Sequence, residues 1–176
     1  MDLNHQGGQV GTRMRIVPLV GAVALALVAA QPGKAQVNFG PELNWASNSI
    51  GFGIGARAEF SLAKAIPTVK GLGVTGSFDY FFPGSGLTYW EINGNGTYHF
   101  DIPTVKTIAP YVGAGLVIAH TSVSGCPLGG CSATNAGLNL LAGTNFKSLG
   151  KITPFAELRL ELRTGSAFVL TGGVLF

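Results

Sequence analysis

Two short segments carry residue types that can support covalent chemistry, and one of them is His120-Thr121-Ser122. A serine becomes a nucleophile when a neighbouring base takes its proton, and an acid in turn orients that base. His120 and Ser122 could fill the first two roles, but the sequence has no aspartate or glutamate between Asp101 and Glu157. We therefore expect no catalytic site, and a hydrolase built on this pair is the alternative.

The other segment contains Cys126 and Cys131, which enclose Pro-Leu-Gly-Gly. A metal site would need further ligands at suitable spacing, and the neighbouring sequence offers none. In an exported chain, two cysteines at this spacing predict one disulfide that stiffens the tip of a loop. We expect no metal site and no cofactor.

Most of the remaining charge recurs at every second position, which places side chains on one face of a β-strand. In residues 152–163, Leu158 and Leu160 alternate with Arg159 and Glu161. The mixed signs predict salt bridges inside a crowded interior, and a leaky channel is the alternative. The residues of this predicted interior charge network are Glu42, Arg57, Glu59, Asp79, Glu91, Glu157, Arg159, Glu161 and Arg163.

These charges belong to a wider pattern, since period-two alternation recurs eight times and turn residues separate the segments. Segments of about 10–13 residues match tilted strands that cross a membrane. The pattern predicts an all-β fold, an eight-stranded antiparallel up-and-down transmembrane β-barrel. The predicted strands are residues 37–46, 50–62, 72–82, 87–100, 109–121, 134–146, 152–163 and 167–176, of which 109–121 is apolar on both faces.

The composition of the polar face indicates which face points outward. A water-exposed face is rich in lysine and glutamate, whereas here the polar face is mostly glycine, asparagine, serine and threonine. The lysines Lys64, Lys70, Lys106, Lys147 and Lys151 all fall in predicted turns. Large aromatic residues lie on the opposite face near strand ends, as in the interfacial girdles of outer-membrane barrels: Phe39, Trp45, Phe60, Phe82, Trp90, Phe100, Phe168 and Phe176. We expect the apolar face to point into lipid; a soluble periplasmic barrel with an apolar ligand pocket is the alternative.

Residues 1–35 have the layout of a cleaved secretory signal peptide. Arg13 and Arg15 precede the apolar run 16–30, and cleavage after Ala30 or Ala35 satisfies the small-residue rule. Met14 offers an alternative start, and an N-terminal membrane anchor is the other interpretation. Residues 36–176 are then predicted to form the barrel as one domain.

The composition excludes several classes of protein. The chain has 176 residues, of which 47% are hydrophobic and only 11% charged, too few charges for a disordered chain or a coiled coil. Removal of residues 1–35 takes away three basic residues and one acidic residue and leaves 8 basic and 7 acidic residues. The basic balance of the full sequence therefore does not predict a nucleic-acid partner.

With these features the chain resembles the outer-membrane-protein β-barrel domain family, the small barrels of the OmpA group. Residues 110–115, Pro-Tyr-Val-Gly-Ala-Gly, look like the mid-barrel signature of that family. The alternating residues Phe168, Leu170, Val174 and Phe176 resemble the signal that the barrel-assembly machinery recognises. The family usually has long surface loops, whereas here only residues 122–133 form a longer one. The resemblance therefore does not imply an adhesin built on large loops.

The resemblance implies a location in the outer membrane of a Gram-negative cell. The implied partners are outer-membrane lipid, lipopolysaccharide and, during biogenesis, the barrel-assembly machinery; we expect a monomer. We expect a structural or surface-interaction role without catalysis. A narrow passive pore is one alternative. Another is an enzyme that modifies lipid A, because lipid A deacylases are also eight-stranded barrels with a similar His-x-Ser pair.

Overall fold

A computed structural model describes residues 36–63, 66, 68–84, 86–105, 107–125, 131–147 and 151–176 of the chain. Eight strands lie in these residues: β1 (Gln36–Ala46), β2 (Gly51–Ser61), β3 (Leu72–Phe81), β4 (Leu87–His99), β5 (Ile108–Val123), β6 (Ser132–Phe146), β7 (Thr153–Leu162) and β8 (Ala167–Leu175). Each predicted strand is present, with boundaries close to those predicted. The predicted signal peptide, residues 1–35, lies outside the described residues. No helix in the described part of the chain has the length and hydropathy needed to cross a membrane.

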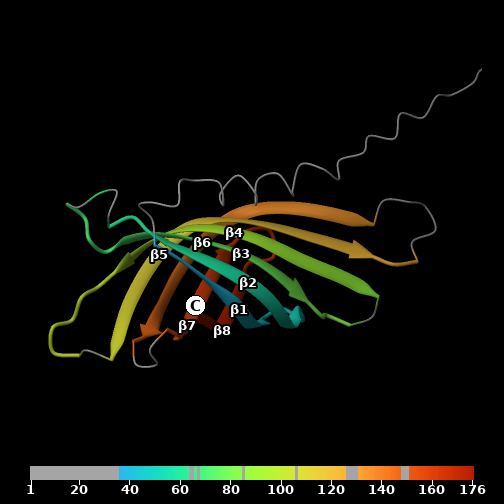
Figure 1. Ribbon diagram of the computed structural model, residues 1–176. Coiled ribbons are helices and arrows are strands. Elements are labelled where there is room, and N and C mark those ends of the chain that lie inside the picture. Colours follow the sequence, from blue (N-terminus) through green and yellow to red (C-terminus); the bar gives the residue numbers. More distant parts are fainter. Residues whose placement is uncertain are drawn as a thin grey trace, which may run out of the picture. The chain divides into compact units, whose positions relative to one another are not determined.

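The strands form one closed antiparallel barrel in which each pairs with the next and β8 pairs with β1. At this closure, the N–H of Phe176 donates to the carbonyl of Phe39 at 3.0 Å, and the N–H of Phe39 donates back at 3.4 Å. Figure 1 shows the blue β1 beside the red β8. Closure satisfies the strand edges that an open sheet would leave unpaired, and it confirms the predicted fold class.

The barrel has two unlike ends. We call the end at which β1 begins and β8 ends the N/C end, and the opposite one the far end. The N/C end carries the β2–β3, β4–β5 and β6–β7 connections, of which the first two span residues 62–71 and 100–107. Three of the four connections at the far end are short, at residues 47–50, 82–86 and 163–166. The longest connection, residues 62–71, is at the N/C end, while the fourth far-end connection, residues 124–131, is as long as residues 100–107.

The turn between β1 and β2 shows how the sequence fixes a far-end connection. Asn48 and Ser49 have positive φ angles of 58° and 63°, and the N–H of Ile50 donates to the carbonyl of Ser47 at 3.3 Å. Two successive left-handed residues inside such a hydrogen bond make a type I′ turn, whose twist matches that of the paired strands. Asparagine adopts this conformation more readily than most residues.

Side chains alternate between the lumen and the outer surface along the strands. In β1, Glu42 and Asn44 are buried whereas Leu43 and Trp45 are each 55% exposed. The strand period of two puts the first pair inside the barrel and the second pair outside. This alternation gives the barrel a polar interior over part of its height and an apolar outer surface.

Candidate functional site

The outer surface carries an apolar belt between two rings of aromatic side chains. At mid-height the exposed residues include Leu43, Leu116, Leu140, Leu158 and Leu170. The outward-facing aromatic residues near the far end are Trp45, Phe52, Tyr80, Phe82, Trp90 and Phe168, and those near the N/C end are Phe39, Phe60, Tyr98, Phe100, Phe146 and Phe176. An apolar band flanked by two aromatic girdles is the surface pattern of barrels that sit in lipid.

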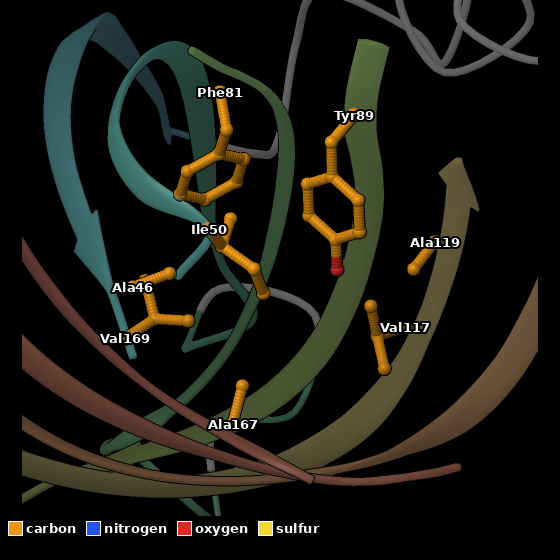
Figure 2. Close-up of a cluster of buried hydrophobic side chains, with 8 residues drawn as sticks. All are labelled: Ala46, Ile50, Phe81, Tyr89, Val117, Ala119, Ala167 and Val169. Atoms are coloured by element: carbon orange, nitrogen blue, oxygen red, sulfur yellow. The ribbon is translucent and has the colours of Figure 1, made fainter. Parts of the chain in front are cut away.

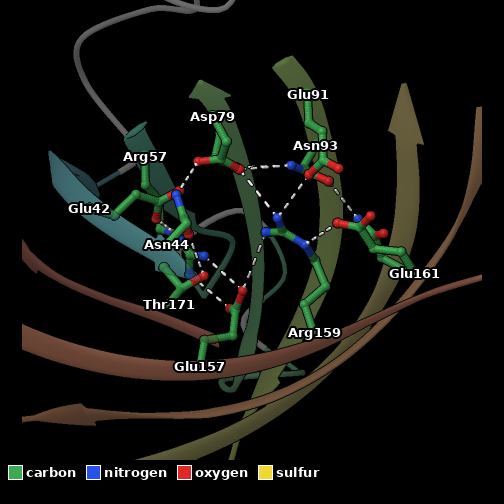
Figure 3. A network of polar contacts seen from close by, with 12 residues as sticks. Glu42, Asn44, Arg57, Asp79, Glu91, Asn93, Glu157, Arg159, Glu161 and Thr171 are labelled. Atoms are coloured by element: carbon green, nitrogen blue, oxygen red, sulfur yellow. Dashed lines mark hydrogen bonds and ion pairs between the residues drawn. The ribbon is translucent and has the colours of Figure 1, made fainter. Parts of the chain in front are cut away.

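Arg159 of β7 is the centre of the polar interior (Figure 3). Its guanidinium lies 3.1 Å from the carboxylate of Glu161, 3.3 Å from those of Asp79 and Glu91, and 3.9 Å from that of Glu157. The Arg159 side chain and its four partners are fully buried. A buried guanidinium is stable only when such partners compensate for its lost hydration.

A second buried guanidinium, that of Arg57, joins β2 to the neighbouring β1 and to β7, three strands away around the barrel. Its Nε donates to Glu42 at 2.7 Å, and its two terminal nitrogens donate to the two oxygens of Glu157 at 2.8 and 2.7 Å. Tyr111 donates to the same Glu157 carboxylate at 2.8 Å, and the Arg57 guanidinium stacks 4.4 Å from the ring centre of Phe155. Bidentate pairing of this kind fixes orientation as well as charge.

Arg163, just beyond the end of β7, extends the network toward the far end. Its Nε lies 3.1 Å from Glu161 and its Nη2 lies 3.4 Å from Glu91. It also donates to the hydroxyl of Tyr89, which in turn donates to Glu91. The three arginines are therefore linked through shared carboxylates.

Neutral side chains complete the network around Asp79. The amides of Asn44 and Asn93 donate to its two oxygens at 2.8 and 3.0 Å, and Thr171 donates to Asn44 at 2.6 Å. Strands from opposite sides of the barrel are thus joined through its centre. At this height the lumen is filled with buried, mutually bonded side chains.

Nearer the far end a cluster of buried, mostly apolar side chains lies in the lumen (Figure 2). Phe81 is fully buried and meets the Tyr89 ring edge-on at 5.5 Å between centroids. Ile50 also lies in this cluster, although the alternation predicts it on the outward face. The tight turn before Ile50 accounts for the difference, because it interrupts the strand and bends the chain across the lumen. The buried apolar cluster consists of Ala46, Ile50, Phe81, Tyr89, Val117, Ala119, Ala167 and Val169.

At the N/C end, residues of β4 to β7 and of the adjoining connections line a cavity of about 730 Å³, which we call the N/C cavity. At its edge, Asn145 donates to Glu59 at 3.5 Å, and Glu59 lies 3.8 Å from Nε2 of His99. Glu59 is predicted as part of the interior charge network, yet these contacts place it in a separate polar group nearer the N/C end. Alternation correctly gives its face but does not give its height in the barrel.

His120 and Ser122, the candidate catalytic pair, are not hydrogen-bonded to each other in the part of the chain that the structure describes. His120 bonds to Thr134 through Nδ1 at 2.8 Å and stacks on Trp90 at 5.0 Å between ring centres. Among the described residues, no acidic side chain contacts His120. The arrangement therefore lacks the acid that orients a catalytic base.

One of the two cysteines of the predicted disulfide is among the described residues. Cys131 accepts a hydrogen bond from Val123 N–H through its carbonyl at 2.9 Å, whereas Cys126 lies outside the described residues. The pairing of these two cysteines stays a prediction. No cluster of metal-ligating side chains occurs in the part of the chain that the structure describes.

The predicted assembly signal lies on the outward face of β8 and the residue after it. Phe168, Leu170 and Phe176 are exposed, and Val174 is half-buried. Leu175, between the last two, points inward and is buried. The four residues thus share one face, and their recognition during assembly stays a prediction.

Comparison with known sequences gives no match to a protein-family model and none to a curated protein. Solved structures do match. Neisserial surface protein A is 21% identical over 80% of this chain and 97% of its own, with a TM-score of 0.57. The N-terminal β-barrel domain of Pseudomonas aeruginosa OprF is 18% identical over 81% of this chain and 100% of its own, with a TM-score of 0.55. The fold is that of a small outer-membrane barrel.

Two features of the barrel are not predicted from the sequence: the apolar cluster near the far end and the N/C cavity. The apolar cluster has a signal, because residues 109–121 are apolar on both faces and so include inward-facing Val117 and Ala119. The N/C cavity has none, because connections such as residues 62–71 have no periodicity from which a side-chain direction could be predicted.

Proposed function

We propose that the chain is an integral outer-membrane barrel with a closed lumen, whose role is structural or surface-interacting and involves no catalysis. The observation that carries this proposal is the inverted polarity of the barrel. Arg159 and Glu161 are fully buried in the lumen, whereas Leu116 and Leu158 are exposed on the outer wall. Water outside the barrel would favour the opposite arrangement.

Lipid around the wall accounts for each part of this pattern. Leucine side chains on the outer wall are stable against the hydrocarbon of lipid, and the aromatic rings meet the headgroups at both interfaces. The backbone groups of every strand are paired in the closed sheet, which lipid requires because it offers no hydrogen bonds. We further propose that residues 1–35 act as the export signal, that the N/C end faces the periplasm, and that the barrel-assembly machinery inserts the chain as a monomer.

The connections at the far end form a small surface for contact with other molecules. Three of them, at residues 47–50, 82–86 and 163–166, contain Arg163 as their one charged residue. These three short turns leave little chain to bind a large external partner, and the longer fourth connection, residues 124–131, contains no charged residue. The proposed contacts are therefore with lipid and lipopolysaccharide around the barrel.

The interior charge network, with six acidic and three basic residues, is also compatible with a pore. A closed lumen distinguishes the proposed role from that alternative. Arg159 bonded to carboxylates of β3, β4 and β7 occupies the centre of the lumen, and the apolar cluster lies beyond it. Purified protein in planar bilayers should give no conductance steps. Reproducible single-channel steps would replace the structural role with that of a pore.

Cell fractionation followed by gel electrophoresis in SDS tests the membrane location. A folded barrel resists SDS and should migrate differently before and after boiling, and the protein should be found in the outer membrane. A soluble periplasmic protein without a heat-dependent shift would contradict the proposal and favour the soluble ligand-binding barrel.

The substitution Leu158→Arg examines the same proposal at one position. Leu158 faces outward near the middle of β7, where an arginine in lipid costs about 2–4 kcal/mol. The variant should unfold at a lower urea concentration in vesicles, whereas it should lose little stability if water surrounds the wall. Leu162→Arg, near the end of the same strand, is the matched control and should lose less.

A lipid A-modifying activity is not part of the proposal, because His120 is bonded to Thr134 rather than to Ser122. The experiment that would reinstate it compares lipid A from cells that express the wild type and Ser122→Ala. Loss of acyl chains that depends on Ser122 would overturn the non-catalytic role.

A further inference from the structure

The N/C cavity has no part in the proposed function, yet it has the volume of a small-molecule site. Its volume of about 730 Å³ is in the range of about 300–1,000 Å³ that ligand pockets occupy. Polar and charged side chains from four different stretches of the chain line it. They include Lys70, His99, Asp101, Asn145, Lys147 and Thr153.

Asn145, which lines this cavity, has a buried acceptor that no described residue satisfies. Its side-chain nitrogen donates to Glu59, but its Oδ1 is buried and has no hydrogen-bond partner among the described residues. A buried polar atom without a partner is costly. A rotation of the side chain would bring Oδ1 to the cavity surface, where a ligand hydroxyl would donate to it and remove that cost.

Lys70 and Lys147 give the rim of the cavity a positive charge. Both are exposed, and neither forms an ion pair among the residues that the structure describes. Asp101 is the one carboxylate that lines the same cavity. Glu59, at the cavity edge, is already engaged with Asn145 and His99, so the two ammonium groups at the rim face one carboxylate and favour an anion.

The distribution of lysine along the whole barrel strengthens this point. All five lysines of residues 36–176 lie in the three connections at the N/C end, and the four far-end connections contain neither lysine nor a carboxylate. A uniformly solvated surface would not require such a separation. The positive potential is thus concentrated at the mouth that holds the cavity.

We propose that the N/C cavity binds a small hydroxylated anion of the sugar-acid or sugar-phosphate class. Lys70 and Lys147 hold the anionic group at the rim, while hydroxyl groups donate to Oδ1 of Asn145 and to Asp101. A cationic ligand is less favoured, because the Glu59 carboxylate already accepts a hydrogen bond from Asn145 and faces His99. This inference depends on the barrel fold and not on the membrane location.

Glucuronate is the probe, and ligand-observed NMR of the folded protein in a neutral detergent is the measurement. Glucose lacks the anionic group and acetate lacks the hydroxyl groups. Glucuronate should bind saturably and at least about 10-fold more tightly than either control, since both kinds of contact contribute. Absence of saturable glucuronate binding, or equally tight binding of glucose, would overturn the proposal.

Two variants attribute the binding to the cavity. Lys70→Gln combined with Lys147→Gln should weaken glucuronate binding about 10-fold, as loss of charged contacts does. Lys151→Gln is the matched control, because Lys151 is exposed at the same end but does not line the cavity; an equal loss there would contradict the site. Asn145→Ala should weaken glucuronate binding and leave that of acetate unchanged.

The gel shift on boiling reports in each case that the variant is folded, and exposed lysines are replaced without loss of packing. Binding of glucuronate by a protein that fractionates outside the membrane would support this inference while overturning the proposed location. Failure to bind glucuronate in a protein that is inserted in the outer membrane would overturn this inference and support the proposed location.

Discussion

From mid-height to the far end, the lumen is packed by three arginines, their carboxylate partners and an apolar cluster. At the N/C end, residues of β4 to β7 and of the connections between strands line a cavity of about 730 Å³. Arg159 in the packed part is completely buried among four carboxylates. Lys147 in the hollow part is exposed and makes no ion pair with any described residue.

The difference separates two uses of charge in one barrel. Buried charges with several partners join strands across the lumen, and loss of one partner leaves the others uncompensated. Exposed charges at a mouth contribute little to stability and are free to attract a ligand. Stability should therefore depend mainly on the packed part, and the following four substitutions examine this expectation.

Arg159→Met should have the largest effect, because it removes the cation that four buried carboxylates share. Breaking a buried network in this way costs about 3–5 kcal/mol, so the folded fraction should fall sharply. Urea unfolding in vesicles, followed by the gel shift, measures the loss. Arg163→Met, with two carboxylate partners, should lose less; equal losses would contradict a central role for Arg159.

Phe81→Ala should come next, because it opens a void in the apolar cluster. Truncation of a buried phenylalanine costs about 3–5 kcal/mol, and we expect the lower part of this range since Tyr89 can move toward the space. Phe82→Ala, at the adjacent exposed position, is the control. If both variants unfold at the same urea concentration, the cluster does not stabilise the far end.

Asn48→Ala should have a smaller effect at the far-end turn. Alanine tolerates the left-handed conformation at φ 58° less well than asparagine, at a cost of about 1 kcal/mol. Ser49 has the same left-handed conformation, which glycine adopts without strain. Ser49→Gly should therefore keep or raise the urea concentration at the midpoint of unfolding. A lower midpoint for Ser49→Gly would show that the turn does not have this geometry.

Asn145→Ala should have the smallest effect, because it lies in the hollow part. The change removes a weak 3.5 Å hydrogen bond together with an acceptor that has no partner, so the two contributions offset each other to within about 0.5 kcal/mol. Urea unfolding in vesicles again measures it. A loss as large as that of Phe81→Ala would remove the distinction between the two parts of the lumen.

The strands and their faces could be predicted from the sequence because both depend on local alternation. In β7, Leu158 and Leu160 point out while Arg159 and Glu161 point in, as the period of two requires. Once the eight segments are paired in order, antiparallel closure follows from the short turns between them.

Partners across the lumen could not be predicted in the same way. Alternation does not distinguish Glu59, near the N/C end, from Glu42, which bonds to Arg57 at mid-height. Height depends on the stagger of neighbouring strands, such as the pairing of Glu42 with Gly55, and no local pattern encodes it. Ile50 is misplaced for a related reason, since a turn residue leaves the strand alternation.

The pairing of β1 with β8 has a consequence for how the chain reaches this structure. Phe39 and Phe176 are bonded to each other, although almost the whole barrel separates them in sequence. Contacts between such distant segments form slowly, because a long loop must close first. Until they form, β1 and β8 each present an unpaired edge on which another strand can add. A growing barrel therefore has to be kept from self-association until its last strand arrives.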